Sequence, residues 1–242
     1  MSSRARLAAA LILLTPLSAF AKDAPACPDA VKGAEKLVLV LSASMNSRTA
    51  KAEYFERQGG RWARTGAVRP AILGAKGLAW SWASKDIAPA GEPVKQEGDR
   101  KTPAGFFALG KPFGFSRRKN AGGYVHLEKG EHICVDDPAS PHYNSIVPHS
   151  KVDGAKGGED MATIEQYREG LFIDYPTSRA RKGGSCIFIH VWRGESSATT
   201  GCVALAEPDV VEMQELAAKG KAVIGILPKT ARERLRHCFP GL

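Results

Sequence analysis

The chain has 242 residues, of which 43% are hydrophobic and 24% are charged, and its formal net charge at pH 7 is +9. This length suffices for one large domain or two small ones. The basic charge favours anionic partners, but the sequence contains no helix-turn-helix, zinc-finger or RNA-binding motif. We therefore expect no nucleic acid partner, and consider wall polymers and lipid head groups instead.

Residues 1–21 have the pattern of a secretory signal peptide. Arg4 and Arg6 precede a short apolar run, and small residues at its end predict cleavage after Ala21. The run is too short to span a bilayer as a helix. We expect an exported, periplasmic protein without stable membrane insertion, formed by one domain over residues 22–242; an uncleaved N-terminal anchor is the alternative. Loss of the two arginines lowers the formal charge from +9 to +7.

The segments that follow predict mostly strands. A continuous apolar run over 36–42 is typical of a buried strand. Alternation over 50–57 and 61–64, around Gly59-Gly60, predicts a hairpin with one solvated face. The segment 94–110 predicts a polar turn that leads into an aromatic strand. Its adjacent lysine and threonine lack the glycine spacing of a phosphate loop.

The C-terminal third combines strands with one clear helix. Residues 170–175 predict a strand. Over 208–220, Pro208 suits the first helical position, apolar residues repeat at helical spacing, and a glycine ends the pattern. A final apolar strand over 222–227 and a short basic helix over 229–237 follow. Because no internal repeat or change of composition marks a boundary, the sequence predicts a single domain.

One stretch carries residues with chemical potential. The apolar run 186–190 predicts a buried strand with His190 at its end, and Cys202 follows twelve residues later, directly after Gly201. A free thiol has a pKa of about 8.5, so it is mostly protonated at neutral pH. A neighbouring imidazole that takes the proton, or an imidazolium that stabilises the thiolate, makes it reactive. The alternative is that both residues are structural parts of the core.

Five cysteines lie in the predicted mature chain, at Cys27, Cys134, Cys186, Cys202 and Cys238. In an oxidising compartment four of them can pair, and we expect Cys202 to stay free. Cys27 and Cys238 bracket the domain, and Cys134 and Cys186 flank predicted strands, which suits these two pairings, although the sequence permits others. Because no CxxC or HxxxH spacing occurs, we expect no metal site and no cofactor.

Three segments together resemble the YkuD-type L,D-transpeptidases of bacterial cell-wall metabolism. They are 98–105 (Gly-Asp-Arg-Lys-Thr-Pro-Ala-Gly), Tyr143-Asn144 and 184–204, and the resemblance covers about residues 36–228. It implies a mainly β fold, a sandwich or collapsed barrel of mixed sheets with a small helix after the catalytic cysteine. It also implies an acyltransferase that acts on peptidoglycan stem peptides as donor and acceptor.

Matched by position, the resemblance makes Cys202 the nucleophile and His190 the base. Gly201 and Thr200 would shape a turn whose backbone N–H groups stabilise the oxyanion. The implied substrate-binding residues are Tyr143, Asn144, Trp192, Arg193 and Thr199.

The chain departs from the commonest form of the family motif. The usual Ser/Thr-His-Gly-Cys, followed by a small residue and Arg or Asn, is Thr-Thr-Gly-Cys-Val-Ala over 199–204, so the second histidine and the arginine are absent. Val191 replaces a common glycine or serine. Arg193 is a candidate to replace the missing cation in positioning the substrate, whereas the chemistry needs only the cysteine and its base.

The implied reaction is acyl transfer in two halves. The Cys202 thiolate attacks the carbonyl of the L-centre of meso-diaminopimelate in a donor stem, D-alanine leaves, and an acceptor amine resolves the thioester. One alternative is a hydrolase, in which water resolves the thioester. Another is a non-catalytic wall-binding module, in which Cys202 is a disulfide partner.

Overall fold

The computed structural model describes residues 24–117, 123–152 and 157–242, so the predicted signal peptide 1–21 lies outside the described residues. Within these ranges, no helix combines the length and the apolar character needed to cross a bilayer. The strands are β1 Lys36–Ser42, β2 Thr49–Gln58, β3 Arg61–Arg64, β4 Arg69–Ile72, β5 Leu78–Trp80, β6 Thr102–Gly114, β7 Val125–His126, β8 Ile133–Val135, β9 Ile146–Val147, β10 Gly158–Asp160, β11 Glu169–Asp174, β12 Phe188–Val191, β13 Val203–Leu205 and β14 Ala222–Pro228. The α-helices are α1 Asp29–Lys32, α2 Glu207–Ala218 and α3 Lys229–Arg234.

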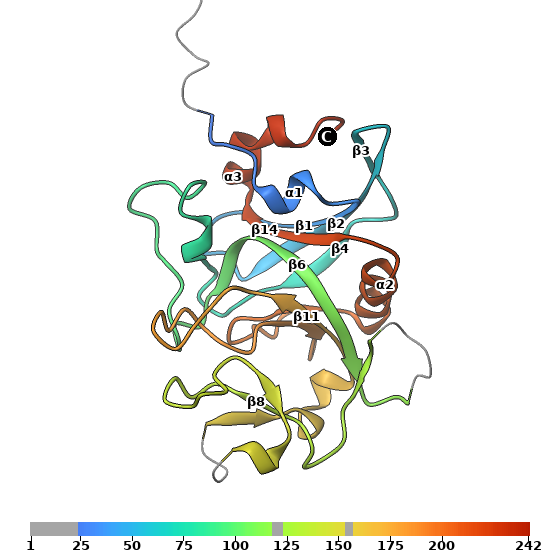
Figure 1. Cartoon of the computed structure of the whole chain (residues 1–242). Coiled ribbons are helices and arrows are strands. Elements are labelled where there is room, and N and C mark those ends of the chain that lie inside the picture. Colours follow the sequence, from blue (N-terminus) through green and yellow to red (C-terminus); the bar gives the residue numbers. More distant parts are fainter. Residues whose placement is uncertain (1–23, 118–122, 153–156) are drawn as a thin grey trace, which may run out of the picture.

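The large sheet closes on itself. Its strand order is β1-β14-β6-β11-β12-β13-β4-β2-β3, and an additional β1–β2 pairing closes the ring, with β3 attached to β2 outside it (Figure 1). β1 runs parallel to β14 and antiparallel to β2, so the sheet is mixed. A barrel of this size is just wide enough for side chains to fill its interior. The predicted mainly β fold, with a small helix, α2, after Cys202, is confirmed.

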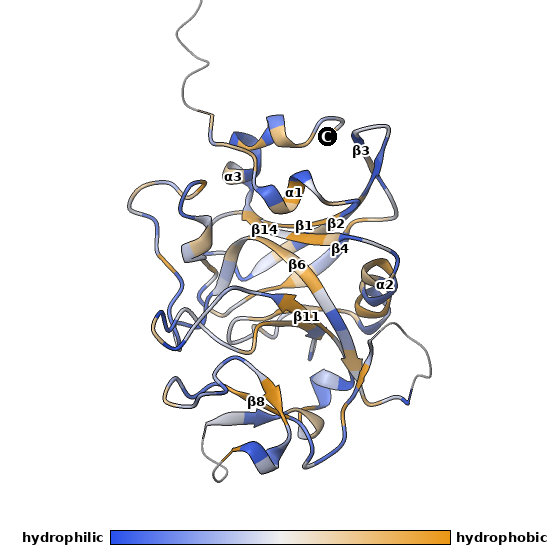
Figure 2. Cartoon of the chain, in the orientation of Figure 1, coloured by the Kyte–Doolittle hydropathy of each residue, from blue (hydrophilic) through white to orange (hydrophobic). Residues whose placement is uncertain are grey.

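Burial explains why the strands differ in pattern. β14 is buried along its whole length; at the top of Figure 1, α3 packs against β14 and β1, and α1 contacts β6. A strand covered on both faces needs a continuous apolar run, and Figure 2 shows these strands as largely hydrophobic. The first half of β2 alternates between exposed and buried residues instead, as expected for a strand with one solvated face.

Left-handed backbone marks two turns. Gly59 and Gly60 have φ of 55° and 81° and join β2 to β3, which confirms the predicted hairpin. Cys186 has φ of 53° without being a glycine. The strand predicted over 186–190 is therefore wrong in its start: the backbone turns at Cys186, and β12 begins only at Phe188.

A separate three-stranded sheet, β10-β8-β9, forms a small lobe at the bottom of Figure 1. A disulfide between Cys134 of β8 and Cys186 joins this lobe to the segment before β12. Among the residues described, Cys202 is the free cysteine. The pairing that the sequence favoured is thus confirmed here, and so is the free thiol.

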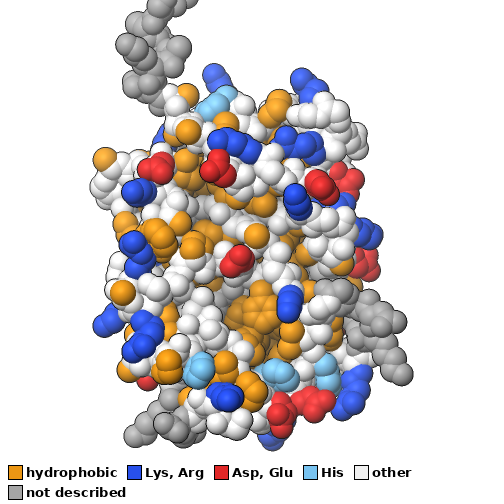
Figure 3. Space-filling model, viewed as in Figure 1, with side chains coloured by type: hydrophobic (Ala, Val, Ile, Leu, Met, Phe, Trp, Pro, Cys, Tyr) orange, Lys and Arg blue, Asp and Glu red, His pale blue; other side chains and the backbone are white. Residues whose placement is uncertain are grey.

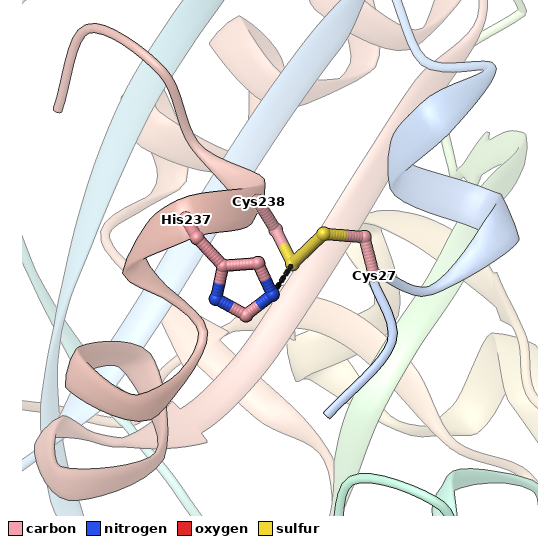
Figure 4. A group of neighbouring side chains, drawn as sticks. All are labelled: Cys27, His237 and Cys238. Atoms are coloured by element: carbon pink, nitrogen blue, oxygen red, sulfur yellow. Dashed lines mark hydrogen bonds between the residues drawn. A yellow bond between two sulfur atoms is a disulfide. The ribbon is translucent and has the colours of Figure 1, made fainter. Parts of the chain in front are cut away.

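The second disulfide joins Cys27 to Cys238 and ties the N-terminal segment to the C-terminal one (Figure 4). His237 lies beside it, with Nε2 3.4 Å from the sulfur of Cys238. These three side chains are close enough together to hold a metal ion. Because both sulfurs are bonded to each other, neither is available as a thiolate ligand.

Candidate active site

The parallel strands β12 and β13 carry the predicted catalytic pair. His190 is opposite Ala204, and Cys202 lies two residues before Ala204, just ahead of β13. Since side chains alternate across a strand, His190 and Cys202 point to the same face of the sheet. Both line one cavity of about 350 Å³. Its other walls include Glu159, Tyr167, Trp192, Arg193, Thr199 and Thr200.

The thiol of Cys202 is buried between backbone groups. It donates a hydrogen bond to the carbonyl oxygen of Cys186 over 3.4 Å, and the N–H of Phe188 donates to its sulfur over 3.4 Å. Burial, together with the negative charge of Glu159, raises the pKa of Cys202 to about 12. The Cys202 side chain is therefore a neutral thiol at neutral pH.

Cys186 is held in its unusual conformation from two sides. Its side chain is bonded to Cys134, and its N–H donates to Oδ1 of Asn144 over 2.9 Å. Asn144 is itself left-handed, with φ of 59°, and its N–H donates to the carbonyl of Val135 in β8. The small lobe thus fixes the Cys186 carbonyl, which accepts the hydrogen bond from the Cys202 thiol.

One ring nitrogen of His190 is engaged by the backbone. Its Nδ1 lies 2.8 Å from the carbonyl oxygen of Val191. Because a carbonyl can only accept, Nδ1 carries the proton and Nε2 keeps its lone pair. Burial lowers the pKa of His190, and the positive charge of Arg193 lowers it further. The ring of Tyr167 packs against the imidazole edge-on at 5.5 Å.

Two threonine hydroxyls bind the backbone carbonyl of Cys202. The carbonyl oxygen of Cys202 accepts from Oγ1 of Thr199 over 2.7 Å and from Oγ1 of Thr102 over 3.2 Å. Thr102, at the start of β6, also accepts from the N–H of Gly74 over 2.8 Å. The sequence analysis identified the segment that contains Thr102 but gave this residue no role. Its signal in the sequence is a hydroxyl residue at the first position of a largely apolar strand.

The turn before Cys202 differs in detail from the prediction. The N–H of Gly201 donates to Oγ1 of Thr199 over 3.1 Å, so this donor is already engaged. A Cβ on Gly201 would lie 3.1 Å from the Ile187 side chain and 3.3 Å from the carbonyl oxygen of Lys101, so a larger residue would require a small shift of these neighbours. Thr200 is exposed at the cavity rim. The roles of Gly201 and Thr200 at the oxyanion stay predictions.

Tyr143 and Asn144 do not lie at the thiol cavity. Tyr143 is buried, and its hydroxyl donates to the Glu97 carboxylate, which also accepts from Oγ of Ser185 over 2.7 Å. Asn144 lines a neighbouring hollow of about 280 Å³ with Phe172. Figure 3 shows a hollow with hydrophobic side chains at its floor near β11. Both predicted residues therefore support the segment around Cys186, and substrate contact by them stays a prediction.

Glu159 and Tyr167 are cavity residues that the sequence analysis did not assign. Glu159 comes from β10 in the small lobe, and Tyr167 from the 3₁₀ turn Glu165–Arg168 before β11. The Tyr167 hydroxyl donates to the Glu159 carboxylate over 2.5 Å. Neither residue stands near His190 or Cys202 in sequence, so no local motif could have found them.

Comparison with known proteins places the chain in a family. Residues 47–224 match the family model of the YkuD L,D-transpeptidase catalytic domain. The chain is similar to the helical cell shape determining protein Pgp2 from Campylobacter jejuni, with 17% identity, a TM-score of 0.39, and 80% of this chain and 48% of that chain covered. It is also similar to Bdellovibrio bacteriovorus Bd1075, with 16% identity, a TM-score of 0.39, and 84% and 54% covered.

This chain spans about half the length of those two solved structures. No curated protein matches it. The family model covers most of the sequence, including both His190 and Cys202. The chain belongs to the family of YkuD L,D-transpeptidase catalytic domains.

Proposed function

We propose that this protein is a peptidoglycan L,D-transpeptidase, with Cys202 as its nucleophile and His190 as its base. One observation carries the proposal: a free thiol and an imidazole with an unprotonated Nε2 line the same cavity of a YkuD domain. A nucleophile paired with a base is what acyl transfer through a covalent intermediate requires.

The first half-reaction forms the thioester. The S–H of Cys202 turns from the Cys186 carbonyl and gives its proton to Nε2 of His190. The sulfur attacks the carbonyl carbon of the L-centre of meso-diaminopimelate in the donor stem. As the oxyanion collapses, the C–N bond to D-alanine breaks, and His190 returns the proton to the leaving amine. Backbone N–H groups near Cys202 stabilise the oxyanion, and losing such a donor typically costs roughly 10²- to 10³-fold in rate.

The second half-reaction resolves the thioester. The amine of an acceptor stem attacks the acyl carbon, His190 takes a proton from that amine, and the C–S bond breaks. The proton returns to the sulfur, so the thiol is regenerated. Thr199 keeps the turn before Cys202 in place, while Trp192 and Arg193 form walls that position the substrate. Arg193 also supplies a cation in place of the arginine that the common family motif has after its cysteine.

We place the reaction in the periplasm. The predicted signal peptide 1–21 supports export, and two disulfides suit an oxidising compartment. The wall-binding alternative treated Cys202 as a disulfide partner, but Cys186 is paired with Cys134 and Cys202 is free. The free thiol therefore favours the enzyme over the wall-binding module.

Product analysis tests the proposal. The predicted mature chain 22–242 and its Cys202→Ala variant are incubated with purified disaccharide tetrapeptide, and products are identified by mass spectrometry. Crosslinked dimers with loss of D-alanine, absent with the variant, support the transpeptidase. Tripeptide alone would mean that water resolves the thioester, and unchanged tetrapeptide would contradict the proposal.

A further inference from the structure

Glu159 brings an acidic group into the thiol cavity. It lies on β10 opposite Cys134 of β8, and its side chain lines the same cavity as Cys202 and His190. The negative charge of Glu159 disfavours the thiolate form of Cys202 and so contributes to the raised pKa of this thiol. The proposed mechanism assigns no role to this carboxylate.

Only one oxygen of the carboxylate is bonded. Oε2 accepts from the Tyr167 hydroxyl, and among the described residues Oε1 has neither a hydrogen bond nor an ion pair. Tyr167 cannot supply a counter-charge. Its ring is packed edge-on against Phe113, Phe188 and His190, which fixes the direction of its hydroxyl. The Oε1 atom of Glu159 is thus available to accept a hydrogen bond from a ligand.

The surroundings make an unpaired carboxylate unfavourable. Burial raises the pKa of Glu159, and the negative charges of Asp136 and Glu97 raise it further. Arg193, the basic residue of the cavity wall, is exposed and forms no ion pair with Glu159 in the described part of the chain. Because Glu159 is half-buried, its carboxylate is only partly solvated, and a cationic ligand at Oε1 would stabilise its charge.

We propose that Glu159 binds an ammonium group of the stem peptide and selects substrates that carry one. The inference rests on the proposed function, because diaminopimelate has a second amino group on its side chain, which is cationic at neutral pH. The bound cation would also offset the negative charge that disfavours the Cys202 thiolate. Glu159 is thus a specificity residue that links substrate binding to activation of the thiol.

Binding measurements test the proposal without turnover. The Cys202→Ala variant is titrated calorimetrically with the disaccharide tetrapeptide, and with the same peptide acetylated on its side-chain amine. A charge-assisted hydrogen bond predicts that the free amine binds roughly tenfold to a hundredfold more tightly. In Cys202→Ala/Glu159→Gln, which keeps an oxygen for the Tyr167 hydroxyl, the two affinities should be equal. Glu195→Gln, which removes an exposed carboxylate absent from the cavity wall, should preserve the preference.

Two results would overturn the inference: equal affinities for both peptides in Cys202→Ala, or a preference that persists after Glu159→Gln. Release of D-alanine by the wild type, measured with unmodified tripeptide present as the acceptor in every reaction, then shows which stem carries the ammonium that Glu159 binds. If Glu159 binds the ammonium of the donor stem, acetylation of the tetrapeptide lowers D-alanine release roughly tenfold to a hundredfold. If Glu159 binds the ammonium of the acceptor stem, this acetylation leaves release unchanged, and Glu159→Gln weakens crosslinking to the tripeptide. Absence of all D-alanine release would sink the proposed function, while the affinities would still decide the role of Glu159.

Discussion

The thiol of Cys202 donates a hydrogen bond to the backbone oxygen of Cys186, whose own sulfur is bonded to Cys134. The disulfide therefore reaches from the small lobe to a residue in contact with the nucleophile. Positive φ is unfavourable for a non-glycine residue, so Cys186 needs such support from its surroundings. We therefore expect the disulfide to support the site as well as stability.

Removing this disulfide should impair both stability and catalysis. Cys134→Ser/Cys186→Ser opens a loop of 52 residues, which costs about 4 kcal/mol of unfolding free energy in the chain-entropy model. D-Alanine release should also fall, because the Cys186 carbonyl and the Phe188 N–H lose their fixed positions. Denaturant unfolding and a D-alanine assay measure the two effects.

The matched control is Cys27→Ser/Cys238→Ser. This disulfide joins the terminal segments and does not contact Cys202, so its loss should lower stability while folded protein keeps the wild-type rate. Equal rates in both double variants would show that the Cys134–Cys186 bond serves stability alone.

The resting thiol should react slowly with alkylating agents. Burial holds the pKa of Cys202 at about 12, against about 8.5 for a free thiol. Alkylation by iodoacetamide should therefore be slow between pH 7 and 9 and rise only above that range, whereas the unfolded protein reacts near its ordinary pKa. Rapid alkylation at pH 7 would indicate a thiolate–imidazolium pair in the resting site.

Turnover should be level across neutral pH. His190 acts as a base only when neutral, and its pKa lies below the ordinary value of about 6.5. The kcat/KM for D-alanine release should thus rise as pH increases through this lowered pKa and then stay constant through pH 8. Because the charge of Arg193 lowers the pKa, Arg193→Gln should move the acidic limb toward higher pH. His190→Asn should lower the rate by roughly 10²- to 10⁴-fold.

Thr102→Val should weaken the support of the nucleophile. The hydroxyl is fully buried and bonds the Cys202 carbonyl and the Gly74 N–H, so its loss leaves buried backbone groups with fewer partners. We expect a loss of about 1–3 kcal/mol in unfolding free energy and slower D-alanine release. Thr49→Val, on the exposed side of β2, is the control and should change neither. Wild-type behaviour of Thr102→Val would refute this role.

The strands were predictable because burial shapes local sequence. β1 contains the unbroken apolar run Leu-Val-Leu-Val-Leu and β14 is apolar along its length, and the glycines of the β2–β3 hairpin mark their own turn. Closure of the barrel was not predictable from these patterns. It depends on pairing β1 with β14, whose residues are far apart in sequence and carry no mark of their register.

The site was predictable only where its residues are neighbours in sequence. His190 and Cys202 lie within one short segment that resembles the family motif. Glu159 reaches the cavity from the small lobe, and Thr102 reaches the Cys202 carbonyl from β6. Tyr143 shows the opposite case, since the family resemblance suggested a groove residue and the structure buries its hydroxyl on Glu97.

The central claim is that Cys202 carries the acyl group, and intact-protein mass spectrometry tests it most directly. Protein 22–242 is mixed with disaccharide tetrapeptide, quenched with acid within seconds and weighed, then digested to locate the adduct. The account predicts a mass increase equal to the donor minus D-alanine, on the peptide that contains Cys202 and absent from Cys202→Ala. D-Alanine release that continues undiminished in Cys202→Ala, or an adduct on another residue, would contradict it.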